Sequence, residues 1–247
     1  MRALKINKVA EITILFWLIK IVATTLGETL GDYISMTLDL GYLIGIMITA
    51  LFFITALLIQ LNVKKYIPVF YWLVIVSTTT LGTEISDFID RSLNLGYALG
   101  SVLLLTGLLT TLFLWHKKYL TLKVFPIYEK NKEIYYWVAI LFSNSLGTAF
   151  GDYLIDNVGL SYINGAIVTG CIIIIVVLLH YFTKINEIVL FWIAFVFTRP
   201  FGATFGDFLT KPLSKGGLEL GTLPSTLILI TIISGLIFFS HQKIKKD

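Results

Sequence analysis

Charged residues are scarce in this sequence. They make up 14% of its 247 residues, whereas about a quarter of an ordinary soluble domain is charged. Hydrophobic residues make up 57%, and apolar runs of about 18 or more residues recur along the whole length. This composition excludes an ordinary soluble domain and predicts an all-α fold, namely a polytopic membrane helix bundle.

Cysteine is nearly absent, and so are the motifs of common catalytic centres. Cys171 is the single cysteine, which excludes an internal disulfide. The sequence contains no Gly-rich nucleotide loop and no H-E-x-x-H or C-x-x-C motif. We therefore expect neither a cofactor nor an enzymatic activity. The net charge of +4 does not indicate nucleic acid, because the basic residues lie at the ends of the apolar runs, so the expected partner is the lipid bilayer.

The apolar runs predict eight transmembrane helices of about 20 residues each. They cover residues 12–38, 41–61, 69–89, 96–115, 134–155, 162–181, 188–209 and 220–240. The polar segment 117–132 predicts a cytoplasmic linker between a first half, residues 1–116, and a second half, residues 133–247.

The distribution of basic residues predicts the orientation. Most of the 19 Lys and Arg residues lie on the side of the two termini, including Arg2 and Lys5. By the positive-inside rule this side is cytoplasmic, so both termini are expected there. Arg91, Lys211 and Lys215 lie at the opposite ends of the spans, where we expect them to be solvated, as we do Asp90 and Asp156. The alternative for these two Asp residues is an entry vestibule.

One sequence motif occurs four times. In each copy a Trp precedes a Gly by ten residues, and that Gly precedes an Asp by five: Trp17, Gly27 and Asp32; Trp72, Gly82 and Asp87; Trp137, Gly147 and Asp152; Trp192, Gly202 and Asp207. Each copy holds two spans, so all copies have the same orientation and form a parallel repeat. The spacing in residues from copy one to copy three equals that from copy two to copy four. This predicts two similar halves related by a pseudo-twofold axis.

This pattern of four tandem two-helix repeats, each with a Trp and a Gly-x-x-x-Gly-Asp stretch, resembles a bacterial family of integral membrane proteins of unknown function. The resemblance covers the chain from Val9 to about His241. It implies a multi-pass protein of the bacterial inner membrane with eight spans. It supplies no activity and no site residues.

The Trp and the small residues of each copy have structural interpretations. We expect the Trp to anchor at the headgroup level. The two small residues of each copy are four apart and share a helix face, so neighbouring backbones can approach closely there. The predicted packing residues are Gly27, Gly31, Gly82, Ser86, Gly147, Gly151, Gly202 and Gly206.

The acidic residues of the repeat do not follow from packing. Asp32, Asp87, Asp152 and Asp207 stand at one register, with Glu28 and Glu84 about one turn below. An ionised Asp at the centre of a span costs about 2.5–3.5 kcal/mol, so these groups must face inward and be protonated, paired, hydrated or bound to a cation. We expect Arg199 to be the one cation at comparable depth, and Thr25, Thr80 and Asn144 to complete the site.

We therefore predict one acidic site, with the four Asp residues as metal ligands or proton carriers of a proton-coupled cation transporter or exporter. An all-oxygen set favours hard cations such as Mn²⁺, Mg²⁺, Ca²⁺ or Na⁺. One alternative is a non-transporting scaffold or sensor, in which each Asp bonds across a helix interface. An intramembrane aspartyl hydrolase is less favoured, because four equivalent acids are not a specialised pair. The sequence leaves the oligomeric state open.

Overall fold

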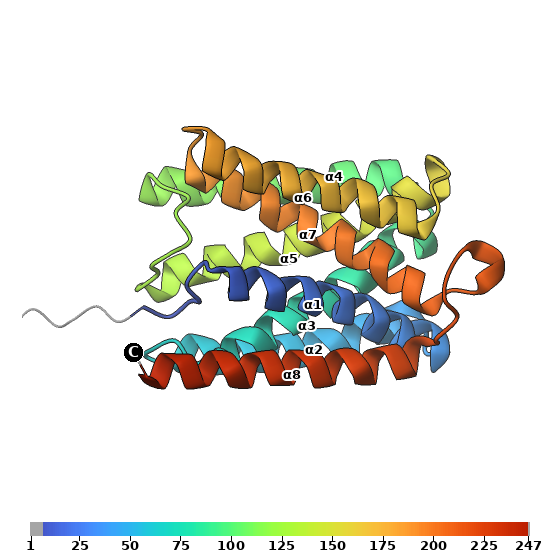
Figure 1. Cartoon of the computed structure of the whole chain (residues 1–247), viewed down its shortest axis with the longest axis horizontal. Helices are drawn as coiled ribbons and strands as arrows, with labels where there is room; N and C mark the ends of the chain where they lie inside the picture. Colours follow the sequence, from blue (N-terminus) through green and yellow to red (C-terminus); the bar gives the residue numbers. More distant parts are fainter. Residues whose placement is uncertain (1–6, 247) are drawn as a thin grey trace, which may run out of the picture.

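The computed structural model describes residues 7–246, and it describes side chains up to residue 242. This part of the chain holds eight α-helices and no strand (Figure 1), which confirms the all-α prediction. The helices are α1 (Ile14–Asp32), α2 (Gly41–Asn62), α3 (Pro68–Asp87), α4 (Gly96–Tyr119), α5 (Lys130–Asp152), α6 (Tyr162–Phe182), α7 (Glu187–Thr210) and α8 (Thr222–Lys246). Arg2 and Lys5 lie outside the described residues.

Seven helices of the described part are long and apolar enough to cross a membrane. Such a set is the hallmark of a multi-pass membrane protein. The eighth helix, α3, falls short because it has the polar run Ser77–Thr80 and, further along, Glu84. These polar side chains are buried inside the protein and do not face the surroundings of the bundle, so α3 can be less apolar than its neighbours.

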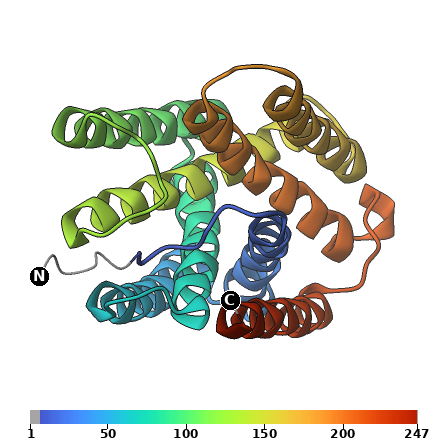
Figure 2. The same ribbon diagram turned by 60° about the vertical axis from the view of Figure 1, so that its left-hand side comes forward.

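The four first helices of the repeats form a closed inner ring. Along this ring α1 packs on α3, α3 on α5, α5 on α7, and α7 again on α1, as Figure 2 shows from near one end. Polar residues line these contacts and are buried, whereas large apolar side chains of α2, α4, α6 and α8 are exposed. This is the inside-out distribution expected of a bundle surrounded by lipid.

The outer helices interlock the repeats. Each packs mainly on the inner helix of the following repeat: α2 on α3, α4 on α5, α6 on α7, and α8 on α1. The predicted halves, residues 1–116 and 133–247, therefore contact each other through the outer helices, α4 with α5 and α8 with α1, in addition to the ring contacts of α3 with α5 and of α7 with α1. Their division into separate units stays a prediction.

The tryptophans correct one expectation. Trp72, Trp115 and Trp137 are at most 1% exposed and Trp192 is 7% exposed, so the prediction of headgroup anchors is wrong for the three repeat Trp residues among them. They pack edge to face with neighbouring aromatic rings, for example Trp115 on Trp192 at 5.9 Å between ring centroids. The reason is ring closure, since Trp72, Trp137 and Trp192 of the inner helices face protein instead of lipid, whereas Trp17 of α1 is only partly buried. The aromatic cluster fills the end of the ring nearest the termini.

Candidate functional site

The repeated Asp lies at the far end of each inner helix. Asp32, Asp87 and Asp152 are the last residues of α1, α3 and α5, and each is followed by a π-helical turn, at Tyr33–Thr37, Phe88–Ser92 and Tyr153–Asn157. Asp207 instead lies within α7. Single π-helical turns are rare and are often found at functional sites.

The first Gly of each copy packs against a polar or basic residue of the next copy around the ring, the residue three positions before that copy's own first Gly. A Cβ on Gly82 would lie 3.1 Å from Asn144 Cβ, and one on Gly202 would lie 2.6 Å from Thr24 Cβ. Gly27 faces Thr79 and Gly147 faces Arg199 in the same way. These glycines thus let the helices approach closely, and the contact of Gly202 with Thr24 closes the ring.

The second small residues meet different neighbours. The nearest atoms to a Cβ on Gly31 belong to Thr83, on Gly151 to Ala203 and on Gly206 to Glu28. Ser86 instead donates a hydrogen bond to Asp90 at 3.3 Å. Glu28 of α1 therefore packs against Gly206 of α7, where the missing Cβ leaves room for it.

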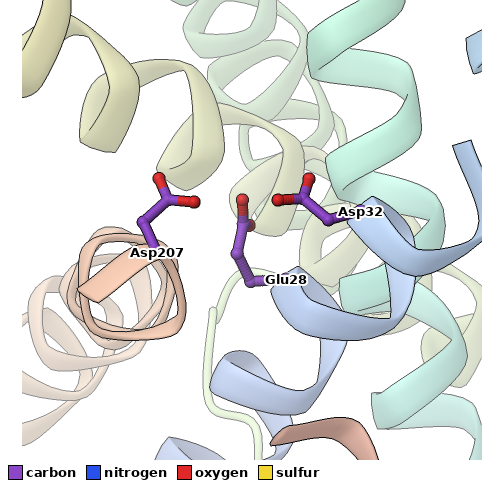
Figure 3. Close-up of side chains that lie close together, drawn as sticks. All are labelled: Glu28, Asp32 and Asp207. Carbon is purple, nitrogen blue, oxygen red and sulfur yellow. The ribbon is translucent and has the colours of Figure 1, made fainter. Parts of the chain in front are cut away.

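Three carboxylates converge at the contact between α1 and α7 (Figure 3). One ligand oxygen each of Glu28, Asp32 and Asp207 lies within 4.8 Å of the other two. Lys211 Nζ donates to Asp32 Oδ2 at 2.6 Å and lies 3.2 Å from Asp207 Oδ1. Its side chain is only 23% exposed, so the prediction of a solvated Lys211 is wrong.

Arg91 makes the corresponding link on the opposite side of the ring. Its guanidinium lies 3.0 Å from Asp152 Oδ2 and 3.5 Å from Asp87 Oδ1, and it donates to the hydroxyls of Tyr42 and Tyr97 at 3.1 Å each. The prediction of a solvated Arg91 is therefore also wrong. The side chain folds back by one helical turn, which brings it to its own repeat's Asp.

The sequence contains a pattern that could have predicted the ion pairs of Arg91 and Lys211 with the Asp residues. In copies two and four the residue four positions after the Asp is basic (Arg91, Lys211), whereas copies one and three have Met36 and Asp156 there. Each basic residue joins the Asp of its own copy to the Asp of the next. The acidic ring is therefore divided into two pairs of Asp, each bridged by one cation.

Arg199 forms a third pair deeper in the ring. Its Nη2 donates to Glu28 Oε2 at 2.7 Å and to Thr83 Oγ1 at 2.5 Å, and all three residues are buried. The expectation that Arg199 is the one cation at this depth is thus wrong, because Arg91 and Lys211 also reach the carboxylates.

Glu84 does not belong to this group. Counted from the first Gly of its copy, it stands one residue further along than Glu28, and Thr83 takes the equivalent position. Glu84 therefore points about 100° away and lies against Gly45 of α2, whose missing Cβ leaves room for its carboxylate. Among the described residues neither of its carboxylate oxygens has a hydrogen-bond partner.

The remaining predicted residues lie elsewhere. Thr25 and Thr80 donate to carbonyls of their own helices, at 3.1 and 3.0 Å. Asn144 accepts from the buried Lys20 and donates to Thr78, both at 3.0 Å, and contacts none of the carboxylates of the ring. Asp90, which we expected to be solvated, is buried against Gly100.

The acidic ring opens into a pocket of about 260 Å³ on the side away from the termini. It is lined by Met36, Arg91, Asp152, Ile155, Asp156, Tyr162, Asp207, Lys211 and Lys215. Both basic bridges and one Asp of each pair therefore border a single space.

Electrostatics keep the Lys211 bridge charged. Burial lowers the pKa of Lys211, but the carboxylates of Asp207 and Asp32 outweigh this effect and raise the pKa above its usual value. A raised pKa in the folded state stabilises the fold below the unfolded pKa of about 10.4. This stabilisation is lost only when the pH rises through the folded value, so the Lys211 ammonium is charged at neutral pH.

Comparison with known proteins identifies the repeat. A family model described as "Repeat of Unknown Function (DUF347)" matches the chain four times, at residues 15–66, 70–119, 135–186 and 190–242. The four matches confirm the predicted resemblance to a family of four tandem repeats. No curated protein and no solved structure matches the chain.

Proposed function

We propose that this chain, which belongs to the DUF347 repeat family, is a multi-pass membrane transporter that binds a cation at its acidic ring and couples its movement to protons. The observation that supports this most directly is the convergence of Glu28, Asp32 and Asp207 within 4.8 Å of one another in the buried end of a helix ring. Buried ionisable groups in spanning helices commonly mark ion pathways.

Charge balance supports a cation as the substrate. Six carboxylates line the ring and its pocket, namely Glu28, Asp32, Asp87, Asp152, Asp156 and Asp207, and Lys215 also lines the pocket. Among the described residues three cations pair with them, namely Arg91, Arg199 and Lys211. An excess of carboxylates attracts cations, and carboxylates that repel one another can exchange a proton for a cation. The predicted hard cations remain candidates because oxygen ligands suit them.

The two ends of the ring differ in a way that suits alternating access. The acidic end borders a pocket, whereas the other end is filled by buried Trp and Tyr side chains. We infer that this conformation is open on one side, and that a second conformation opens the other. We also infer that all eight helices span the bacterial inner membrane, because α3 lies between α1 and α5, and that both termini are cytoplasmic.

Flux measurements test the proposal. In proteoliposomes, Asp32→Asn together with Asp207→Asn is expected to reduce cation-dependent proton flux at least about tenfold, because two of the three converging carboxylates lose their charge. Asp39→Asn is the matched control, since Asp39 is exposed and lies in the loop after α1. Unchanged flux in the double variant across Mn²⁺, Mg²⁺, Ca²⁺ and Na⁺ would disprove the proposal.

The alternatives have less support. The scaffold reading is favoured by the ion pairs that join neighbouring helices, but it does not account for the pocket at the acidic end. The hydrolase reading requires two carboxylates that share a proton, whereas Asp32 and Asp207 share the Lys211 ammonium.

A further inference from the structure

The Lys211 ammonium lies among two carboxylates and a thioether. A primary ammonium has three N–H donors. Nζ lies 2.6 Å from Asp32 Oδ2, 3.2 Å from Asp207 Oδ1 and 3.9 Å from Met36 Sδ. Two of these groups come from the first repeat and one from the fourth, so the site is shaped around one ammonium at their contact.

These surroundings suit an organic ammonium better than a bare metal ion. A thioether such as Met36 is a poor ligand for hard cations. The pocket of about 260 Å³ is also much larger than the roughly 30 Å³ that one water occupies in the liquid. Ile155 and Tyr162 line it together with Met36, and their apolar surface can contact a short carbon chain.

We propose that the transported cation is a small organic amine with a primary ammonium group, and that Lys211 occupies its place in the substrate-free state. The inference rests on the proposed transport function and specifies its substrate class. Binding is then an exchange, in which the incoming ammonium takes over Asp32 and Asp207 while the Lys211 side chain moves into the pocket.

The position of Lys211 permits this exchange. It is the first residue after α7, it borders the pocket, and its side chain is partly exposed. Its backbone stays anchored, because Lys211 N donates to Asp207 O at 2.8 Å and Lys211 O accepts from Glu219 N at 3.0 Å. Side-chain rotation alone can therefore release the ammonium.

Asp207 indicates that the resident ammonium is not the best possible occupant. Its Oδ1 is buried and accepts no hydrogen bond in the described part of the chain, although Lys211 Nζ lies 3.2 Å away. A free ammonium without a tether can orient its donors toward this oxygen. The Arg91 bridge differs, since its guanidinium faces two carboxylates and two tyrosine hydroxyls, and we expect it to remain in place.

Binding to the purified full chain tests the inference. With n-propylammonium as the probe in isothermal titration calorimetry, we expect binding to the wild type, and none for tetramethylammonium, which lacks N–H donors. Lys211→Gln should lower the dissociation constant for n-propylammonium at least about tenfold, because a competitor is removed. Lys184→Gln, an exposed residue at the opposite end, should leave it unchanged.

A second readout needs no variant. Acylation of Lys211 by a water-soluble amine reagent, followed by mass spectrometry and expressed relative to acylation of the exposed Lys184 in the same sample, should become several-fold faster with saturating n-propylammonium, because reagent consumed by the free amine lowers both lysine signals alike. An unchanged rate, or an equal dissociation constant in Lys211→Gln, would overturn the exchange. Metal-ion flux that depends on Asp32 and Asp207 without n-propylammonium binding would overturn the substrate class and leave the transport function standing. Neither flux nor binding of any cation would overturn both.

Discussion

Replacing Glu28 by Gln is expected to lower the free energy of unfolding by about 3 kcal/mol, at the lower end of the cost of breaking a buried ion pair. Arg199 is completely buried, and Glu28 is the carboxylate in contact with its guanidinium, at 2.7 Å. The substitution leaves this cation uncompensated, although the Gln oxygen still accepts a hydrogen bond. The measurement is reversible unfolding by dodecyl sulfate in mixed micelles, followed by Trp fluorescence.

Glu84 provides the matched control for this prediction. It is as buried as Glu28, but it forms no ion pair among the described residues. Glu84→Gln should therefore change the free energy of unfolding by less than about 1 kcal/mol. Combining Glu28→Gln with Arg199→Met should recover part of the loss, because no unpaired charge stays buried. Equal losses for Glu28→Gln and Glu84→Gln would show that the Arg199 pair does not stabilise the ring.

Replacing Gly202 by Val is expected to destabilise the protein by about 1–3 kcal/mol, because it overpacks the contact that closes the ring. A Cβ at this position would lie 2.6 Å from Thr24 Cβ and 2.7 Å from the Thr24 carbonyl carbon. The second atom belongs to the backbone, so no side-chain rotation relieves the clash. The hydrogen bond from Thr24 Oγ1 to Thr198 O, now 3.1 Å, should lengthen as α7 moves away from α1.

The control for Gly202 is a glycine with open space around it. A Cβ on Gly235 in the exposed face of α8 would meet no atom within 4 Å. Gly235→Ala should therefore stabilise the helix by about 0.5–1 kcal/mol, since Ala has the higher helix propensity. Both variants are compared in the same unfolding assay. If Gly202→Val were as stable as Gly235→Ala, the α1–α7 contact could not be as close as the structure shows.

Local features of the sequence were sufficient to predict the helices and the register of the repeat. Each observed helix overlaps a predicted span, because hydropathy and length are properties of neighbouring residues. Three of the four inner helices end at the repeated Asp, because the copies share one local sequence pattern. The first Gly of each copy could also be assigned to helix contacts from its spacing alone.

The tertiary structure decided what each polar side chain faces. Arg91 and Lys211 stand at the ends of the spans, where solvation is the simplest expectation, yet both fold back onto the Asp residues. Glu28 and Glu84 differ by one position in their copies, which directs one into the ring with Arg199 and the other toward Gly45. Trp72, Trp137 and Trp192 are buried because the ring closes around them.

The physical reason is that these contacts are not local. An outer helix packs on the inner helix of the next repeat, and α8 returns to α1 from the other end of the chain. The sequence by itself therefore determined the spans, the four-copy register and the presence of buried acids. Only the closed ring determined which acids share a cation, since that depends on which helix faces are brought together across repeat boundaries.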